Sequence, residues 1–380
     1  MPDSPTATRI DATEASATVV SHNPAVTAWA LRYFGPWWNA VDAPPPGVDD
    51  PAGGPVIVAE VDPRRLADLA AGVAGSPPEQ TMYARASMRV ARSDDGSVQA
   101  LSPTEELAYR TVPGLGRILI VGANEQPVST AAARLAREAV RAVLHREGWT
   151  LLHASAVVSD GRAVLTFGSK GAGKTTTALL LARHCGWKLL ANDRIFVRVD
   201  PSGVQILPWP AAAAIGLGLL DALGLYDLAH ERVQAGEQLH PTQDERITAA
   251  LRAGHRIPLR EPDGRELKAQ VFPDQLFTWF GLPLATSGHA TVLLFPTVAA
   301  GTTAARAQQC RSLTEADFFS TTTEDRYPDI FGLALADSVT RDHARAVARE
   351  RLACLPHYAV TLGHDITANI DVLGKIVASI

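Results

Sequence analysis

Cysteine and lysine are scarce in this chain, and their scarcity narrows what the protein can be. The sequence has three cysteines and no Cys-x-x-Cys pair. A small, odd number of dispersed cysteines indicates a reducing compartment rather than a disulfide framework. Lysine occurs five times, at positions 170, 174, 188, 268 and 375, and all other basic residues are arginines. A lysine within a motif is therefore not explained by background composition.

The sequence also lacks a long apolar run, an excess of positive charge and a secretory leader. The nearest candidate for a membrane span, 211–225, is shorter than the roughly 18 residues that such a helix needs and contains Asp221. The net charge of −5 argues against a broad nucleic-acid-binding surface. The N-terminus has neither the basic nor the apolar region of a signal peptide. We therefore expect a cytoplasmic protein without nucleic-acid or membrane partners.

The pattern along the chain predicts an α/β protein with two domains. Residues 1–20 are polar and aperiodic, which predicts a mobile N-terminus. Residues 21–125 predict a smaller α+β domain that includes two strands around an Asp95–Gly96 turn. Residues 126–380 begin with a helical pattern and continue with strand, glycine-rich loop, helix and strand. That order is typical of an α/β nucleotide-binding core.

The charged segment 226–269 is expected to act as a lid or substrate arm. It lies between the nucleotide-binding motif and a later apolar strand, and Pro262–Gly264 signals a turn within it. Closure over bound substrates would bring Arg256, Arg260 or Lys268 toward them. The alternative interpretation is a hairpin whose charges are simply solvated.

The glycine-rich loop is the most specific motif of the chain. Residues 168–175 read GSKGAGKT and fit G-x(4)-G-K-[ST], the Walker A or P-loop pattern, without a mismatch. Glycines let successive N–H groups face the phosphates of a nucleotide, and the following helix adds its positive N-terminal end. Lys174 is expected to reach the β- and γ-phosphates, and Thr175 to ligate Mg²⁺. The predicted nucleotide-binding residues are Gly168, Ser169, Lys170, Gly171, Ala172, Gly173, Lys174, Thr175 and Thr176.

The lysines also indicate which nucleotide binds. Guanine-specific folds usually carry [NT]-K-x-D, in which the aspartate contacts the guanine edge. The five lysines follow Ser, Gly, Trp, Leu and Gly, so none of them begins that motif. ATP is therefore the expected nucleotide.

A carboxylate follows the next apolar strand, where a P-loop enzyme needs one for Mg²⁺. Asp193 ends the run LLAND, nineteen positions after Lys174, which is an unusually short spacing. We expect Asp193 to hold the metal and to orient or deprotonate an acceptor. An aspartate after Asn192 is also ordinary turn chemistry, so a solvated turn acid is the alternative.

Three stretches together resemble a known family. LLHASAVV (151–158), GSKGAGKT and LLANDRIFV (189–197) have the order and nearly the spacing of the C-terminal catalytic domain of HPr kinase/phosphorylase. The resemblance is specific over about Leu151–Val197 and loose through Pro296. It implies a P-loop kinase that transfers the γ-phosphoryl group of ATP to a serine hydroxyl with Mg²⁺. It also places His153 close to the phosphates.

Two positions depart from that family. Asn192 stands where the family has its first aspartate, thought to be the general base, and the family's arginine-glycine signature is absent. HPr and the reverse phosphorolysis are therefore not expected. A divergent kinase fits better, with a hydroxyl of a peptide, protein or small molecule as acceptor. Relatives in peptide natural-product pathways phosphorylate a precursor serine, which is an analogy at family level.

The candidate catalytic residues each have a plainer interpretation. His153 can be a core histidine, Asn192 can cap a turn, and Arg194, which could counter charge on the phosphoryl group, can be an exposed arginine. Two other functions remain open: an ATP sensor without phosphotransfer, which Asn192 favours, and an ATPase. The acceptor and the oligomeric state, including a homo-oligomer, also remain open. The candidate catalytic set is Asp193, Lys174, His153, Asn192 and Arg194, with Thr175 and Asp193 for Mg²⁺.

Overall fold

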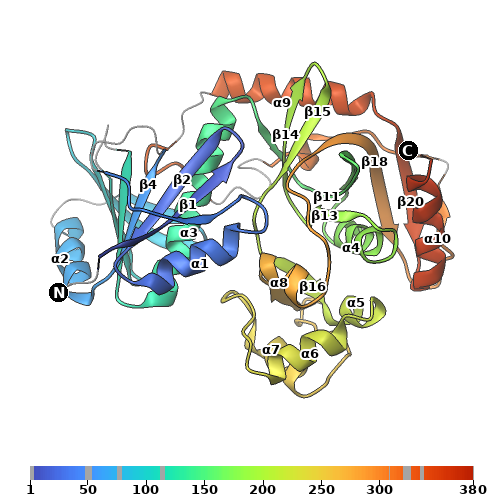
Figure 1. The fold of residues 1–380 in the computed structure, drawn as a ribbon, viewed down its shortest axis with the longest axis horizontal. Coiled ribbons are helices and arrows are strands. Elements are labelled where there is room, and N and C mark those ends of the chain that lie inside the picture. The colour runs from blue at the N-terminus through green and yellow to red at the C-terminus, as the bar shows by residue number, and fades with distance from the viewer. Residues whose placement is uncertain are drawn as a thin grey trace. The chain divides into compact units, whose positions relative to one another are not determined.

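The chain divides into two compact units. The structure, a computed structural model, describes residues 4–47, 54–74, 79–111, 116–307, 309–319, 327–333 and 338–379. Unit 1 comprises Met1–Gly148 and Ser320–Arg341, and unit 2 comprises Trp149–Phe319 and Asp342–Ile380 (Figure 1). Both units combine helices with mixed sheets, so the expected α/β class is confirmed.

Unit 1 is built on one twisted mixed sheet. Its strand order within the described residues is β3-β1-β2-β4-β9-β8-β7-β6-β5. The central strands β2, β4 and β9 are parallel, and β9 through β5 form an antiparallel meander. The strands are β1 (Thr6–Ala12), β2 (Ala15–Ser21), β3 (Val41–Ala43), β4 (Val56–Val61), β5 (Glu79–Tyr83), β6 (Ala86–Arg92), β7 (Val98–Ser102), β8 (Leu107–Thr111) and β9 (Arg117–Gly122). The helices are α1 (Pro24–Phe34), α2 (Pro63–Ala74) and α3 (Glu125–Arg146).

The expectation of a mobile N-terminus over residues 1–20 is wrong, because residues 6–21 form the antiparallel pair β1–β2. Side chains that look like surface residues in the sequence are buried here with hydrogen-bond partners. Thr8 is fully buried and donates its hydroxyl to the Thr27 carbonyl at 2.9 Å. Ile10 and Val19 contribute the apolar part of the same buried face. Because these strands are rich in Ala, Thr and Ser, their sequence looks polar and does not reveal that one face is buried.

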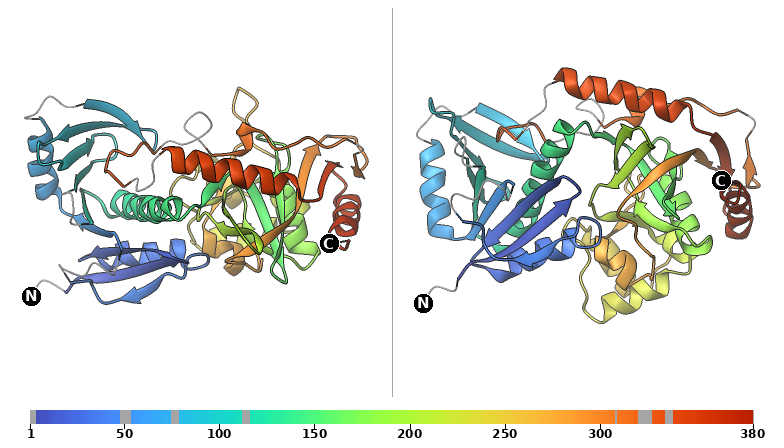
Figure 2. Two further views of the ribbon diagram at one scale, coloured as in Figure 1. Left: turned by 90° about the horizontal axis from the view of Figure 1, so that it is seen from above. Right: turned by 45° about the horizontal axis from the view of Figure 1, so that its top comes forward.

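The predicted domain boundary at residue 125 also differs from the structure. Helix α3 belongs to unit 1, where it packs against α1 and against strands β2, β4 and β9, as Figures 1 and 2 show. Its buried residues include Leu135, Ala139 and Val140. This apolar stripe needs a sheet to cover it, and the parallel strands of unit 1 provide that sheet. Unit 1 therefore extends to Gly148.

Unit 2 holds the glycine-rich loop. Its strands are β10 (Thr150–Leu152), β11 (Ala154–Ser159), β12 (Arg162–Phe167), β13 (Lys188–Ala191), β14 (Ile195–Asp200), β15 (Gly203–Pro208), β16 (Ala213–Gly216), β17 (Lys268–Val271), β18 (Gly288–Val298), β19 (Ala305–Arg306) and β20 (His357–Leu362). The helices are α4 (Lys174–His184), α5 (Leu217–Ala222), α6 (Tyr226–Gln234), α7 (Glu245–Arg252), α8 (Pro273–Thr278) and α10 (Ile366–Val377), with the 3-10 turn η2 (Glu315–Asp317). Helix α9 (Ser338–Ala353) begins in the last residues of unit 1 and continues in unit 2.

Strand direction in the main sheet of unit 2 determines where the site lies. The order is β10-β14-β15-β18-β12-β11-β13 within the described residues, and β20 pairs with β18. Strand β12 is parallel to β18, and β18 is parallel to β20. Strand β11 is antiparallel to both β12 and β13, so β12 and β13 share a direction. The C-terminal ends of β12, β13, β18 and β20 therefore meet the N-terminal end of β11 at one edge.

The segment expected to be a lid forms part of a small packed subdomain. The pair β16–β17 brackets α5, α6 and α7, and α8 follows it; Figure 1 shows these helices grouped together. Ile247 and Leu251 of α7 are fully buried. The predicted turn is confirmed by the antiparallel bridge between Arg260 and Glu266. A segment with its own buried residues is more than a loose arm, and its closure over a substrate stays a prediction.

Two of the cations proposed for that lid, Arg256 and Arg260, have side-chain partners inside the subdomain. Arg256 pairs with Asp221 and Asp227 and lies over the Tyr226 ring, 4.5 Å from its centroid. Arg260 donates to the Gly264 carbonyl at 2.9 Å, and the backbone of Lys268 pairs with Gly216. For Arg256 the contacts indicate a structural role.

No helix in the described parts of the chain combines the length and the apolar character needed to cross a membrane.

Candidate functional site

The loop between β12 and α4 has a backbone that favours glycine. Gly171 and Gly173 have φ angles of +86° and +106°. A Cβ atom on Gly173 would lie 2.6 Å from Cγ2 of Val298, at the end of β18. At Gly171 a Cβ atom would meet nothing within 4 Å. Gly173 therefore serves two needs, a left-handed backbone and a close approach to the neighbouring strand.

Lys174 lies at the first helical position and bends back over the loop. The residue is 7% exposed, and its Nζ donates to the Gly168 carbonyl at 2.7 Å and lies 3.5 Å from the Ser169 carbonyl. Its own carbonyl accepts a hydrogen bond from the fully buried Ser155 hydroxyl at 2.9 Å. Strand β11 thus fixes the start of α4, and the loop carbonyls satisfy an ammonium group that would otherwise be costly to bury.

The start of α4 presents backbone N–H groups. The first helical hydrogen bond of this end runs from the Thr177 N–H to the Gly173 carbonyl at 2.8 Å, and no side chain caps the helix at Gly173. The amides just before Thr177 therefore lack intrahelical acceptors, which makes this end of the helix attractive to anions. Ser169 and Lys170 are exposed at the loop, while Thr175 and Thr176 are half-buried.

His153 and Asp193 meet at the same edge of the sheet. His153 connects β10 to β11, and Asp193 follows β13. His153 Nε2 lies 2.9 Å from Asp193 Oδ1, and Arg194 Nε lies 3.6 Å from Asp193 Oδ2. The side chains are 17%, 36% and 20% exposed respectively, so the group is open enough to receive a ligand but is not a solvated surface cluster. The sequence places these residues far from one another, and strand pairing brings them together.

The surroundings keep Asp193 ionised. Burial raises the pKa of this carboxyl, but the His153 hydrogen bond and the positive charges of Arg194 and Lys174 outweigh burial and hold the pKa well below its usual range. The ammonium group of Lys174 lowers the pKa of Asp193. The loop and Asp193 therefore lie in one electrostatic environment. Asp193 is thus a carboxylate at neutral pH, the form that a hard cation requires.

Asn192 is buried beside this carboxylate, with 6% of the residue exposed. Its amide can donate or accept a hydrogen bond but takes no proton at neutral pH. A carboxylate at this position would add a second negative charge directly beside Asp193. The amide avoids that repulsion, and it leaves Asp193 as the acid at the end of β13.

A segment from much later in the chain supports the site, and no sequence pattern predicts it. The backbone N–H of His153 donates to the Asp317 carbonyl at 2.8 Å, and the N–H of Phe319 donates to the Leu151 carbonyl at 3.0 Å. The Phe319 ring lies under the Arg194 guanidinium, 4.7 Å from its Cζ. Residues 317–319 therefore fix His153 through the backbone and Arg194 through its side chain. No local pattern marks a loop for such a role.

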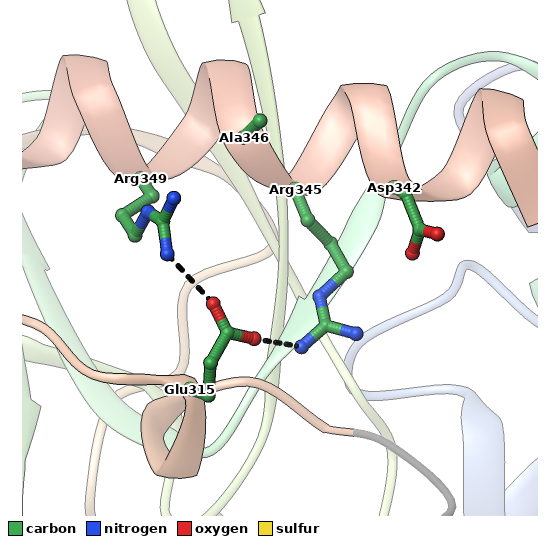
Figure 3. A pocket seen from close by; sticks show the side chains of 5 residues that line it. All are labelled: Glu315, Asp342, Arg345, Ala346 and Arg349. Atoms are coloured by element: carbon green, nitrogen blue, oxygen red, sulfur yellow. Dashed lines mark hydrogen bonds and ion pairs between the residues drawn. The ribbon is translucent and has the colours of Figure 1, made fainter.

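Ion pairs hold that segment in turn. Asp317 is 3% exposed and accepts two hydrogen bonds from Arg311, at 2.6 and 2.7 Å. Glu315, in the same turn, accepts from Arg345 and Arg349 of α9, each at 2.7 Å. Figure 3 shows Glu315 between the two guanidinium groups, in a pocket that Asp342 and Ala346 also line. Because Glu315 already pairs with both arginines, we assign this pocket a structural role: it attaches α9 to the turn that supports His153.

Mg²⁺ fits the chemistry of the site better than a transition metal does. Within the described residues no group of three or more His, Cys, Asp or Glu side chains is arranged to hold a metal ion. Thr175 and Asp193 offer a hydroxyl and an ionised carboxylate, both hard oxygen donors. Mg²⁺ is usually bound by few protein oxygens, together with water and substrate phosphates. Thr175 and Asp193 are therefore the residues that would hold it.

No protein-family model matches the chain, and no curated protein matches it.

The two positive-φ glycines of the loop give a matched pair of substitutions. Gly173→Ala should lower the free energy of unfolding by about 2–4 kcal/mol, since it adds overlap with Val298 to the cost of the backbone conformation. Gly171→Ala should cost only about 1–2 kcal/mol, because its Cβ enters open space. Chemical denaturation followed by fluorescence measures both. Equal losses would contradict the packing described for Gly173.

Proposed function

We propose that this chain is an ATP- and Mg²⁺-dependent kinase of the HPr-kinase type, divergent from that family. It transfers the γ-phosphoryl group of ATP to a hydroxyl of a peptide, protein or small molecule. A serine-like hydroxyl is the preferred acceptor, and peptide natural-product biosynthesis is the preferred setting by analogy with family relatives. The reducing-compartment composition supports a cytoplasmic location.

The proposal rests mainly on one observation, the position of the candidate residues at one edge of the sheet. Loop 168–175, His153 and Asp193 converge on one edge of the sheet, and the charge of Lys174 acts on the Asp193 carboxyl. A site for phosphoryl transfer needs these parts together: amides and a cation for the phosphates, hard oxygens for a metal, and a group that takes the acceptor proton. The resemblance over Leu151–Val197 supports the same assignment.

Each residue of the site has a separate role in the proposed phosphoryl transfer. Loop amides and Lys174 hold the β- and γ-phosphates, with Lys174 exchanging its contacts to Gly168 and Ser169 for phosphate oxygens. Bound through Thr175 and Asp193, Mg²⁺ would neutralise the phosphate oxygens during transfer. The acceptor oxygen attacks the γ-phosphorus, the bond to the bridging oxygen breaks, and ADP leaves. The acceptor proton passes to the His153–Asp193 pair, while Arg194 offers positive charge beside it.

An ATP sensor is the second candidate, and Asn192 favours it. The amide occupies the position at which the resembling family carries its general base, and it is buried rather than exposed to solvent. A protein that binds ATP and signals its presence has no need of a base there. The experiment below separates the two candidates and an ATPase.

Incubation with γ-labelled ATP, Mg²⁺ and a library of serine-containing peptides tests the proposal. We expect label on peptide. Free phosphate alone would indicate an ATPase, and nucleotide binding without turnover would indicate a sensor. Lys174→Ala should reduce transfer at least roughly a hundredfold, because the phosphates lose the buried cation of the loop. Lys188→Ala, which removes an exposed lysine from β13 outside the loop, is the matched control and should retain most activity.

The neighbours Asn192 and Asp193 test the division of roles. Asp193→Asn should reduce the transfer rate at least roughly a hundredfold, because it removes the negative charge that binds the metal and that stabilises a proton on His153. Asn192→Ala should reduce it much less. Equal losses in the two variants, with both proteins folded by circular dichroism, would show that these roles are misassigned. Asn192→Asp restores the family residue, and a gain of reverse phosphorolysis would support the alignment.

A further inference from the structure

A short segment from late in the chain is docked on unit 1. Residues 327–333 come after strands β10 to β19 of unit 2 in the sequence, yet they belong to the compact body of unit 1. Ile330 and Phe331 are 5% and 7% exposed, and Tyr327 is half-buried. Pro328 and Asp329 between them are exposed. The segment thus inserts Ile330 and Phe331 and partly inserts Tyr327, as a bound peptide inserts its anchor side chains.

Aromatic side chains of unit 1 receive this segment. The ring of Phe331 lies 5.5 Å from that of Tyr83 and 5.2 Å from that of Tyr109, measured between centroids. The Tyr327 ring lies 5.7 Å from Tyr83 in an edge-on arrangement. Arg137 of α3, 7% exposed, donates to the Tyr327 hydroxyl at 3.2 Å. We call the residues Tyr83, Tyr109 and Arg137 the aromatic surface of unit 1.

The fit is incomplete in one chemical respect. Tyr83 and Tyr109 are each 1% exposed, and their hydroxyls have no hydrogen-bond partner within the described residues. Burial accordingly raises the pKa of both phenols. A buried hydroxyl without a partner is destabilising, and natural proteins seldom leave two side by side. The segment fills the apolar space against both rings but supplies nothing for their polar ends.

We propose that the aromatic surface is a docking site for a peptide with aromatic side chains four positions apart. Residues Tyr327 and Phe331 occupy it from within the same chain. The spacing comes from the docked segment itself, and the two unsatisfied hydroxyls indicate that this segment is an incomplete occupant of the surface. That the natural ligand is the phosphoryl acceptor rests on the proposed function; the docking itself does not.

A tethered segment competes strongly with a free peptide. Linkage raises the effective concentration of the internal copy to the order of millimolar, so a free peptide of equal affinity binds only when that copy is removed. Removing one aromatic anchor of the internal copy should therefore expose the surface, while leaving Tyr83, Tyr109 and Arg137 in place.

The test uses the full chain and a fluorescein-labelled peptide of sequence YPDIFGL, which copies residues 327–333. Phe331→Ala should bind this peptide at least about tenfold more tightly than the parent chain, by fluorescence anisotropy without nucleotide. The peptide YPDIAGL should not bind. Phe277→Ala removes an aromatic side chain that is 61% exposed on α8 and should behave as the parent does. Adding Lys174→Ala to Phe331→Ala should leave binding unchanged, which separates docking from phosphotransfer.

Two further measurements test whether the variant is folded and whether the two tyrosine hydroxyls are destabilising. If Phe331→Ala loses its near-ultraviolet circular dichroism, Tyr327→Ala replaces it, because Tyr327 is only half-buried. Tyr83→Phe and Tyr109→Phe should each raise the midpoint of thermal unfolding by about 2–4 °C, since each removes an unsatisfied hydroxyl. Equal peptide binding by the parent and the anchor variants, or lower midpoints for both phenylalanine variants, would overturn the proposal.

Discussion

The hydrogen bond between His153 Nε2 and Asp193 Oδ1 is the contact on which the account of this protein depends. It joins the residue that precedes β11 to a residue two positions after the end of β13, and β11 also pairs with β12, which leads into the glycine-rich loop. The bond therefore depends on the register of β11 against β13, and the pairing of β11 with β12 places the loop beside it. Arg194 and Lys174 then act on the same carboxylate, and residues from much later in the chain support His153 through the Asp317 carbonyl and Arg194 through the Phe319 ring.

Much of unit 2 could be predicted because its signals are local. A glycine-rich loop between an apolar strand and a helix is encoded in consecutive residues, and so are the strand before Asp193 and the turn at Gly264. Contacts between residues that are far apart in the sequence produce no such local pattern. The support that Asp317 gives His153 spans more than 160 positions, and a carbonyl is the same in every residue type. Phe319 beneath Arg194 is equally invisible in the sequence.

Unit 1 was harder to predict for a different reason. The turn between β5 and β6 has Ala84 and Arg85 at φ angles of +53° and +75°, a conformation normally marked by Gly, Asn or Asp. Three strands, β5, β6 and β7, therefore stand where two were expected, while the turn at Asp95–Gly96 is confirmed. Polar side chains that are buried with partners, such as Thr8, likewise concealed the β1–β2 pair. In both places tertiary packing overrides the local pattern.

We propose that loop 168–175, Thr175 and Asp193 together form one metal–nucleotide site. A crystal structure of the chain with Mn²⁺ and a non-hydrolysable ATP analogue tests it most directly, because the anomalous signal of Mn²⁺ places the ion independently of the protein. We expect the triphosphate to lie against the amides of loop 168–175. Mn²⁺ should be bound by the oxygens of Thr175 and Asp193, either directly at about 2.0–2.2 Å or through one water molecule. An ion away from Asp193, or a nucleotide bound elsewhere, would contradict it.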